Sequence, residues 1–156
     1  MAQNIHHFKG FSVVQSDVKI HLKLSRFDEQ FNRAQFQLDN MVMTSMVPFM
    51  PFNSGGFINQ TRAESVSLAG SGKVCAGISP AGRFLYEGKT MVDVDTGSPW
   101  ARKGAKKVLV SQYAGKTNAK ENLTYSHGRN AHWFDSAKKA DGAYWVKVTK
   151  QTAGGG

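Results

Sequence analysis

The chain contains one cysteine, Cys75, and four prolines among its 156 residues. A single thiol excludes disulfides within the chain, and it also excludes zinc modules that need four cysteines or paired cysteines and histidines. Long apolar runs are missing too, because the longest, residues 41–52, is divided by Thr44, Ser45 and two prolines and is too short to span a bilayer. Polar residues interrupt the first ten positions, so no secretory signal is expected. We therefore predict a folded protein of a reducing cytoplasm, with no membrane partner.

Acidic residues are also scarce. The chain has 20 Lys and Arg against 11 Asp and Glu, a formal net charge of +9, and residues 69–156 hold fourteen of the basic and six of the acidic side chains. No acidic residue lies between Asp95 and Glu121. The basic residues in that interval are Arg102, Lys103, Lys106, Lys107, Lys116 and Lys120. Such a segment suits an anionic partner, but it lacks both interleaved aromatics and a helix, so any contact with nucleic acid should reach only the backbone.

Motifs that carry chemistry are missing from the sequence. There is no G-x-S-x-G, no complete phosphate-binding loop and no G-x-G-x-x-G, and Gly70–Lys73 lacks both the first glycine and the following Ser or Thr of a phosphate loop. That segment predicts a β-turn. Asp93 and Asp95 would share one face of a strand, where they could hold a cation or serve only solubility, and the second reading is preferred.

Five histidines and the cysteine are the remaining candidates for chemistry. His6 and His7 are adjacent near the N-terminus, and His127 and His132 are five apart without the Glu of a zinc-protease helix, which favours surface histidines over ligands. Cys75 has apolar neighbours and is expected in a core strand, where a thiol is unreactive. We therefore expect no catalytic residue, no cofactor and no metal.

Hydrophobic spacing predicts a strand and then a long helix in the first third of the chain. Residues 18–24 alternate between apolar and polar, which is the pattern of a strand with one buried face. From Ser25, a capping residue, apolar side chains recur every three or four positions to about Met46. Pro48 and Pro51 prevent the helix from continuing, so an extended corner is expected there.

Beyond that corner the composition changes to short β-like runs separated by glycine and proline. The predicted strands cover residues 57–61, 64–69, 73–78, 90–95 and 107–111. A second helix is predicted over 131–150, with a candidate break at Asp141–Gly142. The whole is expected to be one domain, 1–156, with flexible ends at about 1–10 and 151–156.

Two clusters of large apolar residues are expected to be buried. Trp133, Phe134, Tyr144 and Trp145 are too periodic for a stacking platform and indicate core or subunit interface. The methionines between positions 41 and 50 could fill a core or adapt to a neighbouring chain, and the core is the preferred reading.

Five segments, in this order along the chain, carry a resemblance to a known family. They are Val47–Gly56 (VPFMPFNSGG), Arg83–Lys89 (RFLYEGK), Met91–Asp93 (MVD), Thr96–Gly104 (TGSPWARKG) and His132–Lys138 (HWFDSAK). The chain resembles the minor capsid proteins of tailed siphophages of Gram-positive bacteria, which are small head-tail joining proteins. Glu87 stands where a second Tyr is expected, and residues 114–120 match no part of the family pattern.

The resemblance implies an α+β fold in which a small antiparallel sheet or partial barrel packs against the long N-terminal-half helix and the C-terminal helix. It also implies a structural virion protein, made in the host cytoplasm, that forms a ring at the head-tail interface. Its partners would be further copies of itself, the head-closure or connector protein, the tail terminator protein and double-stranded DNA in the channel. A hexamer would match a sixfold tail, and a dodecamer would match the portal.

Two groups of residues are candidates for these contacts. The six basic residues named above would face DNA or an adjoining ring. The candidates for the subunit interface are Pro48, Phe49, Pro51, Phe52, Tyr86, Trp100 and Trp133. Two other functions remain open: a sequence-nonspecific nucleic-acid-binding protein, and a small enzyme that uses Cys75 or a histidine.

Overall fold

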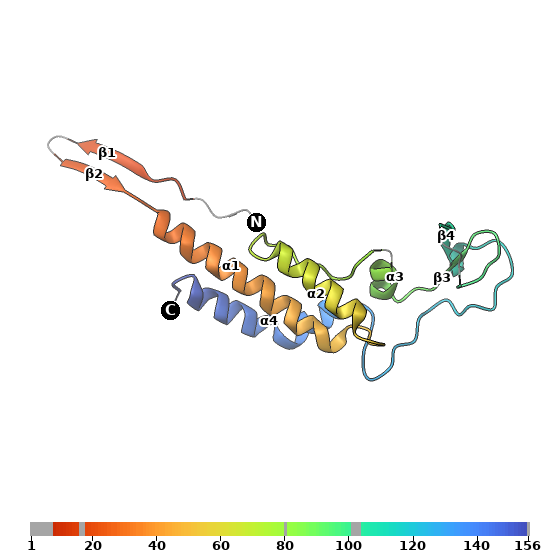
Figure 1. The fold of residues 1–156 in the computed structure, drawn as a ribbon. Coiled ribbons are helices and arrows are strands. Elements are labelled where there is room, and N and C mark those ends of the chain that lie inside the picture. Colours follow the sequence, from red (N-terminus) through yellow and green to blue (C-terminus); the bar gives the residue numbers. More distant parts are fainter. Residues whose placement is uncertain (1–7, 16–17, 80, 101–103, 156) are drawn as a thin grey trace. The chain divides into compact units, whose positions relative to one another are not determined.

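The structure is a computed structural model that describes residues 8–15, 18–79, 81–100 and 104–155 (Figure 1). These residues form an α+β fold of four α-helices, two short 3₁₀ helices and two antiparallel sheets of two strands each, which confirms the predicted class. The α-helices are α1 (Ser25–Met46), α2 (Gly56–Leu68), α3 (Ala81–Glu87) and α4 (Trp133–Thr152). The strands are β1 (Phe11–Gln15), β2 (Val18–Leu22), β3 (Met91–Asp93) and β4 (Lys107–Leu109), and the 3₁₀ helices are η1 (Val47–Phe49) and η2 (Val110–Gln112).

The chain divides into two compact units. Unit 1 comprises Met1–Ser45, Arg62–Cys75 and Ala137–Gly156, and unit 2 comprises Met46–Thr61 and Ala76–Ser136. None of the described helices combines the length and hydropathy needed to cross a membrane.

Helices α1 and α4 form the centre of unit 1. Ala34, Val42 and Met43 of α1 are buried, as is Trp145 of α4, whose indole N–H donates to the Ser45 hydroxyl over 3.1 Å. The last turn of α4 is also held, because the Thr152 hydroxyl lies 2.5 Å from Gln37 Oε1. Helix α4 passes through Asp141–Gly142 without a break.

A buried carboxylate organises the turn after α2. Asp39 of α1 accepts hydrogen bonds from the backbone N–H groups of Gly70 and Gly72 at 2.8 and 3.1 Å, and from the Gln35 amide at 2.8 Å. Both glycines have positive φ, which lets successive N–H groups point at one anion. The segment that resembles part of a phosphate loop therefore binds the chain's own carboxylate.

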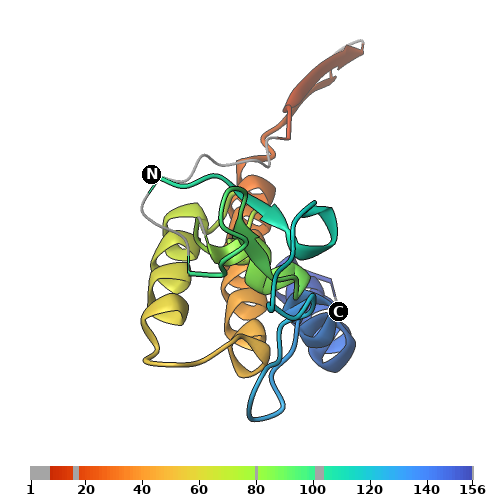
Figure 2. The same cartoon turned by 90° about the vertical axis from the view of Figure 1, so that its right-hand side faces the viewer.

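The N-terminal hairpin of unit 1 is exposed to solvent. Strands β1 and β2 pair with Phe11 opposite Leu22 and Val13 opposite Ile20, and every residue of β2 is exposed. Strand β1 was not expected from the sequence. Figures 1 and 2 show the hairpin leaving the start of α1 with no other element of unit 1 against it.

Unit 2 is built around Trp133 at the start of α4. Its ring is fully buried and meets Phe57 and Tyr86 edge to face, at centroid distances of 6.0 and 4.9 Å. Met46 and Met50 are also buried, which confirms the expected core position of the methionine cluster. The corner between them is a 3₁₀ turn with Pro48 in its first turn, rather than wholly extended, because a proline fits the start of a helix.

The strands predicted over residues 57–61 and 64–69 are wrong, since these residues belong to α2, and residues 73–78 form no strand. The buried positions of α2 and its end are Ile58, Thr61, Ser65 and Ala69, a helical spacing. Two of these four are polar, so the apolar pattern of a helix is hidden. The Thr61 hydroxyl donates a hydrogen bond to the Phe57 carbonyl, and the Ser65 hydroxyl lies within hydrogen-bond distance of the Cys75 backbone.

Candidate functional site

The basic segment surrounds the β3–β4 sheet of unit 2. We call residues 93–100 and 104–120 the basic lobe. Lys106, Lys107, Lys116 and Lys120 are all exposed on it, and Arg102 and Lys103 lie outside the described residues. The pairs across the sheet are Met91 with Leu109, Val92 with Val108 and Asp93 with Lys107.

A buried aspartate shapes the first turn of the lobe. Asp93 is almost fully buried, and its Oδ1 accepts from the backbone N–H groups of Asp95 and Thr96 at 2.8 and 3.4 Å. The backbone closes the same turn, since the Asp93 N–H donates to Ser98 and the Asp93 carbonyl accepts from Gly97. Asp93 and Asp95 therefore do not act as a pair, and Asp93 serves as a turn cap.

Three separate stretches of the lobe meet at Gly97. The ring of Tyr113 lies so close that a Cβ on Gly97 would be 2.6 Å from Tyr113 Cε1. The Thr117 hydroxyl donates to the Gly97 carbonyl over 2.6 Å, and Lys107 Nζ lies 3.3 Å from the Pro99 carbonyl. These contacts hold a glycine-rich basic segment in one arrangement instead of leaving it a solvated loop.

The lobe presents positive charge next to a bare aromatic ring. Among the described residues, none of the four lysines forms an ion pair, whereas Lys89 at its border pairs with Glu121 at 3.4 Å. Trp100 is 90 % exposed. Unpaired ammonium groups on a fixed loop can contact phosphates or carboxylates of a partner without reading base sequence.

The proposed interface residues fall into three groups. Pro48, Phe52 and Trp100 are exposed, and Phe49, Pro51 and Tyr86 are half-buried. Trp133 is completely buried inside unit 2 and cannot reach a second subunit in this conformation, which corrects its place among the interface candidates. The apolar environment that made it a candidate is the chain's own core.

Arg129 was not among the residues selected from sequence patterns. Its guanidinium donates to the carbonyls of Val47 and Met50, and it lies 5.1 Å from the centroid of Phe52. Cations beside the last carbonyls of a helical segment are favourable, so Arg129 fixes the proline corner. The only signal was an arginine inside a turn-forming stretch, His127–Asn130.

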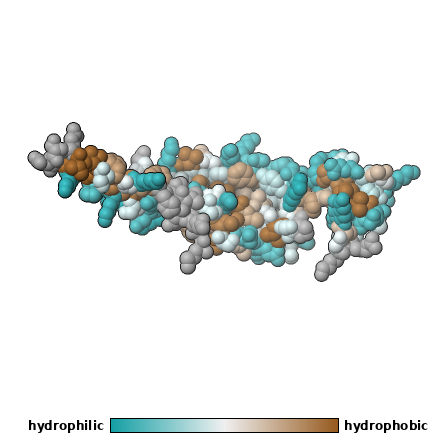
Figure 3. All heavy atoms as spheres, turned by 90° about the horizontal axis from the view of Figure 1, so that it is seen from above, coloured by the Kyte–Doolittle hydropathy of each residue, from teal (hydrophilic) through white to brown (hydrophobic). Residues whose placement is uncertain are grey.

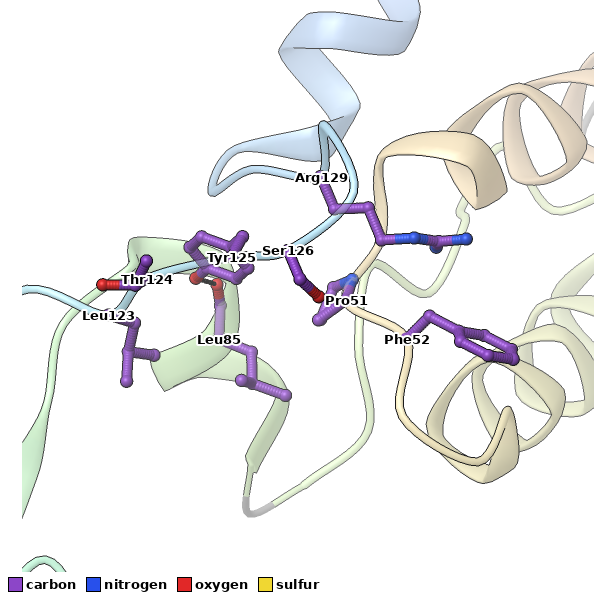
Figure 4. Close-up of a pocket in the computed structure, with 8 residues that line it drawn as sticks. All are labelled: Pro51, Phe52, Leu85, Leu123, Thr124, Tyr125, Ser126 and Arg129. Carbon is purple, nitrogen blue, oxygen red and sulfur yellow. Dashed lines mark hydrogen bonds between the residues drawn. The ribbon is translucent and has the colours of Figure 1, made fainter.

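Beside Arg129 lies a small pocket of about 150 Å³ (Figure 4). Its lining comprises Pro51, Phe52, Leu85, Leu123, Thr124, Tyr125, Ser126 and Arg129. The Tyr125 hydroxyl donates to the Leu85 carbonyl, and burial raises the pKa of that phenol. The polar groups of the pocket are thus engaged within the chain.

Groups that could carry enzyme chemistry are dispersed. His132 lies 3.9 Å from Glu87 and 3.8 Å from Asp135, all three exposed, and the described residues hold no cluster of ligands suited to a metal. Cys75 lies in a loop rather than in the expected strand, half-buried beside Ser65. His6 and His7 lie outside the described residues.

Comparisons of the chain with family models, with curated proteins and with solved structures find no match.

Proposed function

We propose that this chain is a structural virion protein that forms a ring in the neck of a tailed phage and joins the DNA-filled head to the tail. The observation that carries the proposal is the series of five segments, from Val47–Gly56 to His132–Lys138, in the order found in siphophage minor capsid proteins. All five lie within residues 46–138. The ring would contact a head-closure protein on one side and a tail terminator on the other, and its stoichiometry would be six or twelve.

The basic lobe has a role in such a ring. Lys106, Lys107, Lys116 and Lys120 are exposed and have no carboxylate partner among the described residues. Facing a channel, they would neutralise passing phosphates; facing an adjoining ring, they would pair with its acidic side chains. Neither role needs catalysis or a cofactor.

The test is electron microscopy of lysates from a phage whose copy of this gene carries an early stop codon. We expect free tails beside unjoined heads, and the DNA content of those heads shows whether the protein also seals them. A plasmid copy of the wild-type gene should restore joined particles. Normal infectious particles from the stop-codon phage would overturn the proposal.

A sequence-nonspecific nucleic-acid-binding protein is the second candidate, favoured by the same four exposed lysines. It predicts that the isolated chain binds duplex DNA with a log–log salt slope of about −4, because each neutralised phosphate contributes about −0.9. Replacing Lys106 and Lys107 with alanine should then reduce the slope by about 2, whereas Lys138→Ala and Lys139→Ala on α4 should not change it. The neck protein should bind duplex DNA weakly until its ring forms.

A further inference from the structure

One face of the N-terminal hairpin of unit 1 is apolar apart from Gln15, which pairs with Val18. Its apolar side chains are Phe11, Val13, Val18, Ile20 and Leu22, and each is between 41 and 60 % exposed. Figure 3 shows apolar atoms gathered on the hairpin, at the left-hand end of the view. A hairpin of two strands is marginally stable alone, and a bare apolar face is a recognised mark of an interaction site.

The opposite face of the same hairpin is different. It carries Ser12, Val14, Lys19 and His21, and the Ser12 hydroxyl lies 2.8 Å from His21 Nδ1. Residues 8–24 contain three lysines and one acidic residue, Asp17. The hairpin is therefore an amphipathic, positively charged arm.

Helix α1 presents a complementary surface. A groove of about 400 Å³ is lined by Asp28, Glu29, Asn32, Arg33 and Phe36, all from α1. Phe36 is half exposed, and Glu29 and Arg33 are exposed at 3.9 Å from each other. The groove thus combines an apolar ring with two carboxylates in a chain that has few of them.

We propose that the apolar face of this arm packs on the α1 groove of a second copy of the chain. The arm as a whole is basic and the groove carries two carboxylates, so charge favours the groove over a second, equally basic arm. Five partly exposed apolar side chains form a small patch, so the contact should lie at the low end of specific interfaces, below about 1,200 Å² in total.

The arrangement is heterologous, because the arm of one copy meets the groove of the next, and such contacts form a ring when the rotation between neighbours closes and an open filament when it does not. It deepens the proposed neck function and rests on it only for the ring; self-association is testable in the purified protein. Because the area is at the low end, association should be measured at high protein concentration.

The first test compares two neighbouring substitutions by light scattering coupled to size exclusion. Val13→Asp places a charge on the apolar face, and Val14→Asp places the same charge on the opposite, more exposed face. We expect the wild type and Val14→Asp to associate and Val13→Asp to remain a monomer at the same concentration. Equal behaviour of the two variants, or a wild type that is monomeric at sub-millimolar concentration, would overturn the proposal.

The second test places the receiving surface. Phe36→Asp should weaken association at least tenfold, because it places a charge on the apolar ring of the groove. Val66→Asp, the same kind of change on an exposed position of α2, is the matched control and should have little effect. Equal behaviour of the two variants would remove the groove as the receptor.

The two proposals fail separately. Association that depends on Val13, together with normal particles from the stop-codon phage, would leave the arm contact standing and remove the neck function. Unjoined heads and tails, together with a Val13→Asp protein that complements fully, would support the neck function and remove the arm contact.

Discussion

The two sheets of this protein have the same design and opposite surroundings. Both contain two antiparallel strands, β1–β2 in unit 1 and β3–β4 in unit 2. In β3, Val92 and Asp93 are at most 1 % exposed, whereas every residue of β2 is exposed. The β3–β4 sheet, with three residue pairs, has buried side chains, whereas the larger β1–β2 sheet, with five residue pairs, is exposed to solvent.

The difference shows what makes a two-stranded sheet a stable part of a fold. Two strands alone bury too little apolar surface to offset the entropy of ordering them. Next to the β3–β4 sheet, the Asp93 turn, Tyr113 and Thr117 hold the adjoining loops in place. The described residues show no such loop contacts beside the β1–β2 sheet, so we infer that its cover comes from another copy of the chain.

The largest effect should come from a charge placed under the covered sheet. Val92→Asp buries a carboxylate without a partner and should lower the unfolding free energy by at least about 3 kcal/mol. Val13→Asp in the bare sheet should change it by less than about 0.5 kcal/mol in dilute, monomeric protein. Urea unfolding of both variants measures the contrast, and similar losses would contradict the distinction between the sheets.

Next in size is the close approach of Gly97 to Tyr113. Gly97→Ala combines positive φ with a Cβ 2.6 Å from a ring atom, and we expect a loss of about 3 kcal/mol. Gly104→Ala is the control, since its φ is also positive but nothing lies within 4 Å of the added Cβ. Thermal unfolding should show a loss of only about 1 kcal/mol for the control; equal losses would mean that Tyr113 yields freely.

The Asp93 turn should contribute somewhat less. Asp93→Ala leaves the N–H groups of Asp95 and Thr96 without their carboxylate acceptor in a part-buried turn, at a cost of about 2 kcal/mol. Asp93→Asn keeps one side-chain oxygen and should recover about half of that loss. Amide exchange of Asp95 and Thr96 reports the turn directly, and unchanged protection in Asp93→Ala would contradict the assignment.

The smallest effect concerns alkaline pH in unit 2. Burial raises the pKa of the Tyr86 phenol above 10.0, and the charges of Asp135 and Glu87 raise it further. The unfolded chain therefore loses this proton first, so the associated stability is complete below pH 10 and is lost as the pH rises through the folded-state pKa. Tyr86→Phe should make the decline in unfolding free energy above pH 10 shallower, with little change at pH 7. An identical decline would remove Tyr86 as its source.

The spacing of apolar residues predicted a helix correctly where the buried positions are apolar and recur with the helical period. The α1 bounds follow from apolar spacing after Ser25 and from Pro48, which ends the helix near Met46. The same reasoning failed for α2, because Thr61 and Ser65 occupy buried positions and interrupt the apolar period. It also placed Tyr144 on the buried stripe of α4, although Tyr144 is 60 % exposed and Trp145 is the buried neighbour.

The sequence by itself determined the long helix α1, the alternation of β2 and the uninterrupted basic segment, since each depends on neighbours a few positions away. Only the tertiary structure decided that Asp39 caps the Gly70–Gly72 turn, that Arg129 holds the proline corner, and that Trp133 is buried while Trp100 is bare. These outcomes join residues 30 or more positions apart. Spacing along the chain shows which side chains share a face, and only the packed chain shows which of those faces meets another.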